Sequence, residues 1–195
     1  MQNRDVIEFF DRLAPQWDAG IRRNERVIAA ILDATQVREG KRVLDVACGT
    51  GVLIGDYLNR GASLVVGVDI SPKMAQLAGE KFAACPKVRI LCEDAGAVTY
   101  KEPFDCILIY NAFPHFCDPK GLVSHLTGLL AFGGTLTIAH GMSREQLAAH
   151  HMGAAKNVSV SLPPARELAA LLEGYVDITA CVDDEQMYLV SGTLK

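Results

Sequence analysis

Short apolar runs alternate with segments of helical periodicity from about residue 41 onward. Such alternation favours parallel strands joined by right-handed helical crossovers. The apolar runs predict strands at residues 42–47, 64–70, 88–92, 104–110 and 134–140, and a closing hairpin at 176–181 and 186–193 turned by Asp183 and Asp184. We therefore expect an α/β fold, a doubly wound, mostly parallel seven-stranded sheet with a C-terminal antiparallel hairpin.

The segments between these strands predict helices at residues 52–60, 72–83 and 121–130, and two more at 143 to about 152 and from the proline pair 163–164 onward. Ser71 is a good N-cap, and Pro72 suits the first helical position because its missing N–H is not needed there. Gly133 and Gly134 are expected to break the third helix before the fifth strand.

Residues 3–35 form helical patterns that precede the sheet. Within them, residues 9–18 carry two adjacent phenylalanines, a proline and a tryptophan beside an acid, which is typical of a helix packed against a sheet edge. We expect one domain over residues 1–195, divided into an N-terminal helical lid at 1–38, a ligand-binding core at 39–140, and substrate-side helices with the closing hairpin at 141–195.

The charge balance argues against nucleic acid as a partner. The chain of 195 residues has a formal net charge of −4 and a pI near 5.7, whereas nucleic-acid binding calls for a basic face. Arg22, Arg23 and Arg26 form a local cluster, which is expected to be a solvated helix face because Glu25 interrupts it.

The chain has no run of 18 apolar residues, and its first twelve residues are too charged for a signal peptide. We therefore expect a cytoplasmic protein without a membrane span. Six scattered cysteines without a Cys-x-x-Cys pair are expected to be reduced thiols rather than a zinc site or a disulfide framework.

Residues 43–53, Val-Leu-Asp-Val-Ala-Cys-Gly-Thr-Gly-Val-Leu, place a carboxylate four residues before a glycine where a strand becomes a helix. Asp45 would repel the phosphate of a dinucleotide and attract a cation. The dinucleotide fingerprint also lacks its third glycine, since Ile54 stands there. The segment resembles motif I of the class I S-adenosylmethionine-dependent methyltransferases, whose cofactor carries an ammonium and a sulfonium.

The resemblance continues at the ends of the next strands. It implies that the backbone at Ala47, Gly49 and Gly51 lies close to the methionine part of S-adenosylmethionine, although the family usually has glycine at position 47; we expect this departure to cost little room. Asp69 lies about 18 residues past Gly51, near the spacing at which an acid meets ribose hydroxyls.

The remaining cofactor contacts follow from the same resemblance. Ile70 and Met74 are expected beside the adenine, the Asp94-Ala95 pair at its amino group, and the backbone of Asn111 and Ala112 beneath the transferable methyl group. Residues 9–18 are similar to the N-terminal segment that closes over the cofactor in small-molecule methyltransferases, including quinone-methylating enzymes. Trp17 stands where tyrosine is commoner and carries no hydroxyl for the methionine carboxylate.

Methyl transfer needs alignment and exclusion of water, and a neutral hydroxyl or a ring carbon gains from a base as well. An amine presented neutral, or a thiolate, needs none. His115 and His140 are the candidate bases, with His150 and His151 behind them; each could instead be a wall residue. We expect no metal site, because no acid cluster accompanies these histidines.

An apolar acceptor pocket is expected among aromatic and sulfur side chains, namely Phe9, Phe10, Trp17, Tyr110, Phe113, Phe116 and Met152. The sequence thus predicts a methyltransferase that moves a methyl group from S-adenosylmethionine to a small, apolar or aromatic acceptor and releases S-adenosylhomocysteine. Two alternatives stay open: an oxidoreductase that uses a nicotinamide dinucleotide, and a regulatory protein that binds S-adenosylmethionine without catalysis. The oligomeric state is not predicted.

Overall fold

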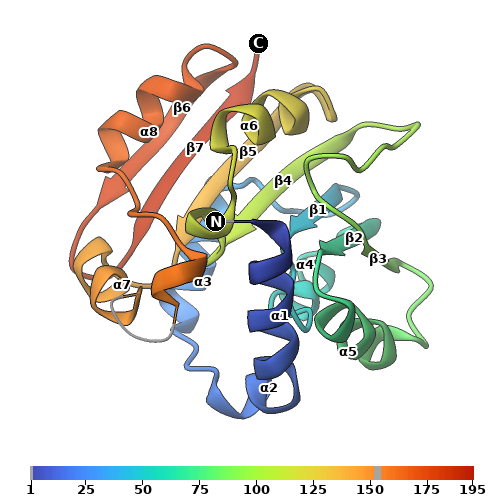
Figure 1. Cartoon of the computed structure of the whole chain (residues 1–195). Helices are drawn as coiled ribbons and strands as arrows, with labels where there is room; N and C mark the ends of the chain where they lie inside the picture. Colours follow the sequence, from blue (N-terminus) through green and yellow to red (C-terminus); the bar gives the residue numbers. More distant parts are fainter. Residues whose placement is uncertain (1, 152–154) are drawn as a thin grey trace.

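A computed structural model describes residues 2–151 and 155–195 of the chain (Figure 1). Its seven-stranded sheet has the order β3-β2-β1-β4-β5-β7-β6. The strands are β1 (Arg42–Val46), β2 (Leu64–Asp69), β3 (Val88–Cys92), β4 (Phe104–Tyr110), β5 (Leu130–His140), β6 (Val176–Asp183) and β7 (Tyr188–Leu194). The pairs β5–β7 and β7–β6 are antiparallel and the other four pairs are parallel, so the predicted doubly wound sheet with a C-terminal hairpin is confirmed.

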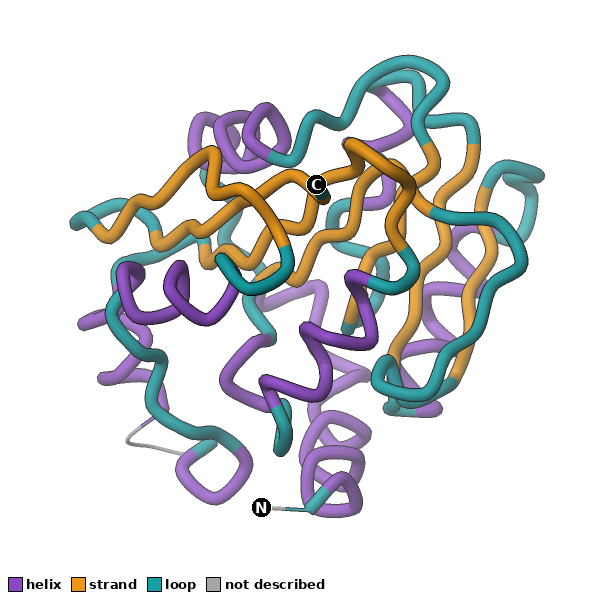
Figure 2. The backbone as a smooth tube through the Cα atoms, turned by 90° about the horizontal axis from the view of Figure 1, so that it is seen from above, coloured by secondary structure: helices purple, strands orange, loops and turns teal. Residues whose placement is uncertain are grey.

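Helices cover both faces of this sheet (Figure 2). They are α1 (Asn3–Leu13), η1 (Ala14–Gln16), α2 (Trp17–Gly20), α3 (Glu25–Ala34), α4 (Ile54–Asn59), α5 (Pro72–Phe82), η2 (Phe113–His115), α6 (Pro119–Thr127), α7 (Arg144–His151), η3 (Lys156–Val158) and α8 (Ala165–Leu172).

The alternation of side chains along each strand divides the core into two clusters. Leu44 and Val46 of β1 pack with the apolar sides of α6 and α8. Val43 points to the opposite face, where it meets the buried residues of α3 and α4. Full burial of a valine or leucine side chain contributes about 1.5–3 kcal/mol, so both faces of the parallel strands hold helices in place. Helix α3 therefore belongs to the packed core, whereas the described residues of α1, η1 and α2 belong to neither cluster.

Local signals decide where several helices begin. The Ser71 hydroxyl accepts a hydrogen bond from the backbone N–H of Met74 at 3.2 Å, which confirms the predicted cap of α5. Asp118 caps α6 in the same way, accepting from the N–H of Gly121 at 2.9 Å, and this helix begins at Pro119 rather than at Gly121.

The predicted break at Gly133 and Gly134 was wrong in its position. The helix already ends at Thr127, and β5 begins at Leu130, four residues earlier than expected. Both glycines lie within β5, in an irregularity where Phe104 pairs with Leu130 but Cys106 pairs with Thr135. A Cβ at Gly134 would lie 2.8–3.1 Å from three backbone oxygens. The glycines therefore let the strand bulge rather than end the helix.

The strand order reverses between β1 and β4, which are neighbours in the sheet. In open α/β sheets, ligands bind beyond the carboxyl ends of the strands at this point. Here α1 and α2 lie beside α5 at that edge (Figure 1). Among the described residues, no helix is long and apolar enough to cross a membrane.

Candidate active site

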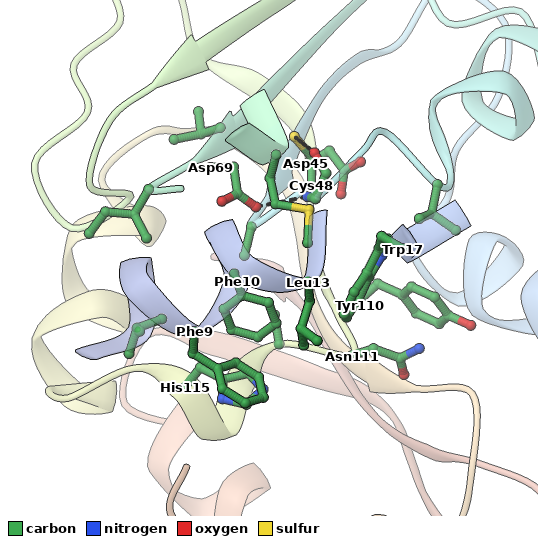
Figure 3. A pocket seen from close by; sticks show the side chains of 18 of the residues that line it. Phe9, Phe10, Leu13, Trp17, Asp45, Cys48, Asp69, Tyr110, Asn111 and His115 are labelled. Atoms are coloured by element: carbon green, nitrogen blue, oxygen red, sulfur yellow. Dashed lines mark hydrogen bonds between the residues drawn. The ribbon is translucent and has the colours of Figure 1, made fainter. Parts of the chain in front are cut away.

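A cavity of about 730 Å³ lies at the carboxyl edge of the sheet, beneath α1 and α2. Twelve of the predicted site residues line it: Trp17, Asp45, Ala47, Gly49, Asp69, Ile70, Met74, Asp94, Ala95, Asn111, Ala112 and His115. Figure 3 shows Asp45 and Asp69 together at one end and His115 toward the other, with Phe10 between them in this view. Segments far apart in the sequence thus meet where the sequence predicted.

The turn after β1 holds its shape through left-handed backbone conformations. Gly49 has φ +56° and Gly51 has φ +78°, which glycine adopts without steric cost. Ala47 has φ +55°. Our expectation that alanine costs little room at this position overlooked the backbone, because an L-residue in this region is disfavoured by about 1–2 kcal/mol.

Gly51 does not line the cavity. A Cβ at this position would lie 2.7 Å from the Phe82 ring, so the glycine is needed where the turn packs against α5. The prediction that Gly51 approaches the cofactor therefore gives way to a structural role in the same turn.

Asp45 is a buried acid, 3% exposed, at the end of β1. Burial raises the pKa of its carboxyl to about 7, and the nearby Asp69 charge adds to the rise. The Tyr57 hydroxyl counteracts this rise, although among the described residues it closes no hydrogen bond of ordinary geometry. A cation in the cavity would therefore stabilise the ionised form of Asp45.

Asp69 joins the glycine turn to the start of α5. One carboxylate oxygen accepts from the N–H of Gly49 at 2.8 Å, and the other accepts from the N–H of Ser71 at 2.8 Å. Burial raises the pKa of Asp69, and these two backbone hydrogen bonds counteract the rise. Each oxygen has a second lone pair, so the carboxylate can accept from a ligand while it holds the turn.

Asp94 lies exposed beyond β3, and its two carboxylate oxygens accept different bonds. One accepts from the N–H of Gly96 at 2.9 Å and the other accepts from the side-chain amide of Asn3 at 2.8 Å. The Asn3 amide donates at the place where the resemblance puts an adenine amino group.

Asn111 turns the chain out of β4. Its φ is +54°, its N–H donates to the carbonyl of Ala139 at 2.9 Å, and its side-chain oxygen accepts from the N–H of Gly141 at 2.9 Å. These bonds tie the ends of β4 and β5 together, and both Asn111 and Ala112 line the cavity.

Three polar side chains connect α1 and α2 to the core. Besides Asn3, Asp11 accepts from the Ser71 hydroxyl at 2.6 Å and from the N–H of Lys73 at 3.1 Å. Asp18 accepts from the Thr50 hydroxyl, and from the Lys81 ammonium at 2.7 Å. Both acids reach α5 or the glycine turn, so the N-terminal segment is attached around the cavity rather than along the sheet edge.

An aromatic row lines the cavity beneath these attachments. The Phe10 ring contacts Trp17 edge to face at 5.7 Å between centroids, and it contacts His115 in the same manner at 5.0 Å. The indole nitrogen of Trp17 lies 3.7 Å from the position that a Cβ would take at Gly49. The row therefore runs from the glycine turn to the loop after β4.

His115 is held by the chain that follows α7. Its Nδ1 lies 2.6 Å from the carbonyl oxygen of Val158. Beside it, the N–H of Val160 donates to the carbonyl of Pro114 at 2.9 Å. Two hydrogen bonds thus fasten η2 to residues 158–160.

His140 does not belong to this cavity. Its side chain is 0% exposed and packs against Tyr188 of β7, with 6.0 Å between ring centroids. It shares a face of β5 with Leu136 and Ile138, which both lie in a core cluster. The structure thus does not bring the candidate base His140 into the cavity, because the alternation of β5 directs this residue into the core.

Two further expectations need correction or fall outside the structure. Arg22 and Arg23 are exposed, as expected, but they lie in the loop before α3 rather than on a helix, and both line the cavity. Met152 lies outside the described residues, and so do the side chains of His150 and His151.

Sequence reasoning missed several lining residues, namely Asn3, Val6, Leu13, Glu93, Met142, Leu147 and Ala155. For Val6 and Leu13 a signal exists, since they lie three or four residues from Phe9 and Phe10 on the same side of a helix. No comparable signal marks the residues after β5.

Comparison with known proteins agrees with this geometry. The model of a methyltransferase domain matches residues 43–134. Demethylmenaquinone methyltransferase of Renibacterium salmoninarum is 28% identical over 141 residues, which cover 69% of this chain and 58% of that enzyme. The chain spans 35% to 42% of the length of several other curated relatives.

Two solved structures share the fold. A chain in the complex between the Trm112 methyltransferase activator of Haloferax volcanii and a methyltransferase has a TM-score of 0.79 and 19% identity, with 97% of each chain covered. Magnesium protoporphyrin IX methyltransferase of Synechocystis, with bound S-adenosylhomocysteine, has a TM-score of 0.74 and 16% identity, with 99% of each chain covered. With an acid at the end of β1, a glycine turn at the switch point and a matching domain model over residues 43–134, this chain carries a methyltransferase domain similar to those of S-adenosylmethionine-dependent methyltransferases.

Proposed function

We propose that this protein transfers a methyl group from S-adenosylmethionine to a small, apolar or aromatic acceptor. The observation that carries the proposal is the division of the cavity. Its acids, Asp45, Asp69, Glu93 and Asp94, all lie at or directly after the carboxyl ends of β1, β2 and β3, whereas α1, η2 and the chain after β5 contribute mainly apolar side chains. One half suits a cationic nucleoside, and the other half suits an apolar molecule.

In the polar half, Asp69 accepts from the ribose hydroxyls, Asp94 accepts from the adenine amino group, and Ile70, Met74 and Ala95 border the ring. Asp45 faces the ammonium of the methionine part. The backbone at Ala47, Gly49, Asn111 and Ala112 approaches the cofactor where side chains are absent or small. These roles are supported by the position of each residue in the cavity lining.

The methionine carboxylate needs a charged partner, which neither the tyrosine hydroxyl nor the Trp17 indole would provide, and Arg22 supplies it in this proposal. Arg22 and Arg23 are the arginines in the lining. Arg23 already pairs with Glu25 and Asp56, each at 2.8 Å. Among the described residues, Arg22 has no ion pair or side-chain hydrogen bond, so its guanidinium is available for a carboxylate.

In the apolar half, Phe9, Phe10, Leu13, Phe116 and Met142 form the walls for the acceptor. His115 lies among them and serves as the general base when the acceptor must lose a proton. Exclusion of water by α1 and α2 keeps the activated methyl group from hydrolysis.

Calorimetry with S-adenosylhomocysteine tests the cofactor half. Replacing Asp69 with alanine should weaken binding about tenfold to a hundredfold, because hydrogen bonds to a charged group contribute about 1.5–3 kcal/mol. Since Asp69 also holds the glycine turn, the 2′-deoxy analogue serves as the control. The wild type should prefer the parent ligand, and the variant should lose that preference. Equal preference in both proteins would contradict the ribose assignment.

Turnover separates an enzyme from a regulatory protein that only binds the cofactor. Release of S-adenosylhomocysteine in the presence of a panel of small aromatic metabolites supports the proposal. Tight cofactor binding without release, across the panel, would favour the regulatory alternative. Binding of a nicotinamide dinucleotide in place of S-adenosylhomocysteine would restore the oxidoreductase alternative.

A further inference from the structure

We infer that the acceptor presents a hydroxyl group on an aromatic or similarly apolar frame, and that this protein methylates it at oxygen with His115 as the base. The inference rests on the proposed function, because it names the substrate class of the same site. It is drawn from the hydrogen bond that His115 makes, from its packing and from the charges around it.

The hydrogen bond to Val158 decides which ring nitrogen carries the proton. A carbonyl oxygen only accepts, so at 2.6 Å the Nδ1 of His115 must be the donor. In the neutral imidazole, the lone pair then resides on Nε2. The backbone thus selects the tautomer in which Nε2 is the basic nitrogen, which is the arrangement that a histidine base requires.

The same bond also orients the ring. Val158 lies in η3, and the neighbouring Val160 is bonded back to Pro114 at 2.9 Å. On another side, the Phe10 ring packs edge to face against the imidazole at 5.0 Å. The Val158 carbonyl and the Phe10 ring therefore hold the imidazole of His115 in one orientation. A general base gains from such a fixed orientation.

The charges of the cavity disfavour an ammonium acceptor. The lining acids come only from the ends of β1 to β3, and the described lining residues from α1, η2 and the chain after β5 include no carboxylate. Burying an ammonium among phenylalanine and methionine side chains without a counter-charge is costly. A neutral hydroxyl on an apolar frame meets no such penalty, provided that a base removes its proton as the bond forms.

The proposed step balances in atoms and charge. The acceptor oxygen forms a bond to the methyl carbon while the bond from that carbon to sulfur breaks, and the bond's electron pair stays on sulfur. The sulfonium becomes a neutral thioether. The hydroxyl proton passes to Nε2 of His115, which later releases it to solvent, and the products are a methyl ether and S-adenosylhomocysteine.

The test compares three series of model acceptors with identical ring substituents: aryl hydroxyls, benzylic amines, which carry an ammonium at neutral pH, and aryl thiols. Aryl thiols are largely ionised at neutral pH and need no base, so they report on cofactor binding and alignment alone. The variant is His115→Asn, whose amide retains a donor for the Val158 carbonyl but cannot take up a proton. His125→Asn is the matched control, because His125 also bonds to a carbonyl, that of Val98 at 2.8 Å, and lies outside the cavity lining.

We expect the wild type to methylate aryl hydroxyls in preference to benzylic amines and to give the methyl ether. In His115→Asn, turnover of the hydroxyl should fall about 100-fold to 10,000-fold, while that of the thiol should change less than about threefold. His125→Asn should behave as the wild type with both.

Three results would overturn the inference while leaving methyl transfer intact: faster methylation of the amines, a product methylated on ring carbon, or an equal loss for hydroxyl and thiol in His115→Asn. Absence of S-adenosylhomocysteine release with all three series, in a protein that binds the cofactor, would instead overturn the proposed function and the inference with it.

Discussion

Asp45 and Asp69 end the neighbouring strands β1 and β2, and the charge of Asp69 raises the pKa of Asp45 beyond what its burial already does. Two buried carboxylates at one edge of a sheet are unfavourable for the free protein. The same pair is favourable once a cation lies between the strand ends and the N-terminal helices. The acidic edge of the cavity therefore lowers the folding stability of the free protein and raises its affinity for a cationic ligand.

Stability should depend on pH through Asp45. Its pKa is raised on folding from 3.8 to about 7, so the folded chain holds this proton more tightly than the unfolded chain. The contribution is fully present below pH 3.8 and is lost as the pH rises through about 7. Asp45→Asn should therefore gain stability over the wild type across this window, by up to about 4 kcal/mol at pH 8.

Denaturant unfolding of both proteins at pH 4 to 8 measures this difference, and Asp177→Asn, at an exposed position of β6, is the control. If the free energy of unfolding changed with pH in the same way in the wild type and in Asp45→Asn, the pKa shift of Asp45 would be contradicted.

Cofactor affinity should change with pH in the opposite sense. Below about pH 7 a proton occupies Asp45 in the free protein, and the ligand ammonium must displace it. The affinity for S-adenosylhomocysteine should fall by as much as tenfold for each pH unit below 7. Calorimetry from pH 5.5 to 8 measures the slope. Asp45→Asn should bind more weakly at pH 8 and lose most of the slope, and an unchanged slope in this variant would assign the dependence to another group.

Arg22 should hold the methionine carboxylate. Arg22→Ala is expected to weaken S-adenosylhomocysteine about tenfold to a hundredfold, the range for a hydrogen bond between charged groups. The decarboxylated analogue should bind wild type and variant equally. Arg26→Ala is the matched control, since Arg26 belongs to the same cluster but does not line the cavity. Equal losses for the parent ligand and its decarboxylated analogue would exclude a contact to the carboxylate.

Residues 3–20 should become more protected from hydrogen exchange when S-adenosylhomocysteine binds, because this segment lies outside the packed core and covers the cavity. Asp18→Ala removes its bonds to Thr50 and Lys81 and should raise exchange in this segment about twofold to tenfold. Trp17, the one tryptophan of the chain, reports the same opening by fluorescence. Glu8→Ala is the control, since its partner Arg4 lies in the same helix. Protection that is identical with and without ligand would make the segment a fixed part of the wall.

Ala47→Gly should stabilise the free protein by about 0.5 to 1 kcal/mol. Relief of the left-handed strain at φ +55° outweighs the entropy that glycine adds to the unfolded chain. Ala112→Gly provides the contrast, because its φ of −131° suits alanine and the substitution should destabilise. Thermal unfolding of both variants compares them directly. Destabilisation of similar size at both positions would show that the strain is absent.

Most of the polar half of the cavity could be predicted from the sequence, for a physical reason. Asp45, Asp69 and Asp94 each lie at or just beyond the carboxyl end of a strand, and parallel strands bring such positions to one edge whatever the loops do. His140 also ends a strand, β5, yet it lies in the core, because its face is decided by alternation with Leu136 and Ile138. This alternation of side chains along β5 can be read from the sequence. It decides the location of His140 more strongly than the position of the residue at a strand end does.

The apolar half could be predicted only in part. Phe9 and Phe10 were recognised through a family resemblance, but Met142 and Leu147 reach the cavity through the packing of loops that carry no periodic signal. The bond from Asn3 to Asp94 spans 91 residues along the chain. Such contacts depend on the position at which α1 packs against the rest of the fold. No local sequence pattern determines that position.

Helices α1 and α2 are attached by side chains rather than by burial in the core. Different parts of the chain therefore form the two halves of the cavity. Recognition of the nucleoside resides in the strand ends, while much of the wall offered to the acceptor resides in a short N-terminal segment. Exchange of residues 3–20 for those of a relative, with Asn3, Asp11 and Asp18 retained, should therefore alter which acceptors are accepted while the cofactor is bound as before. New acceptor preferences can therefore arise in this fold through substitutions within residues 3–20, without any change in the sheet.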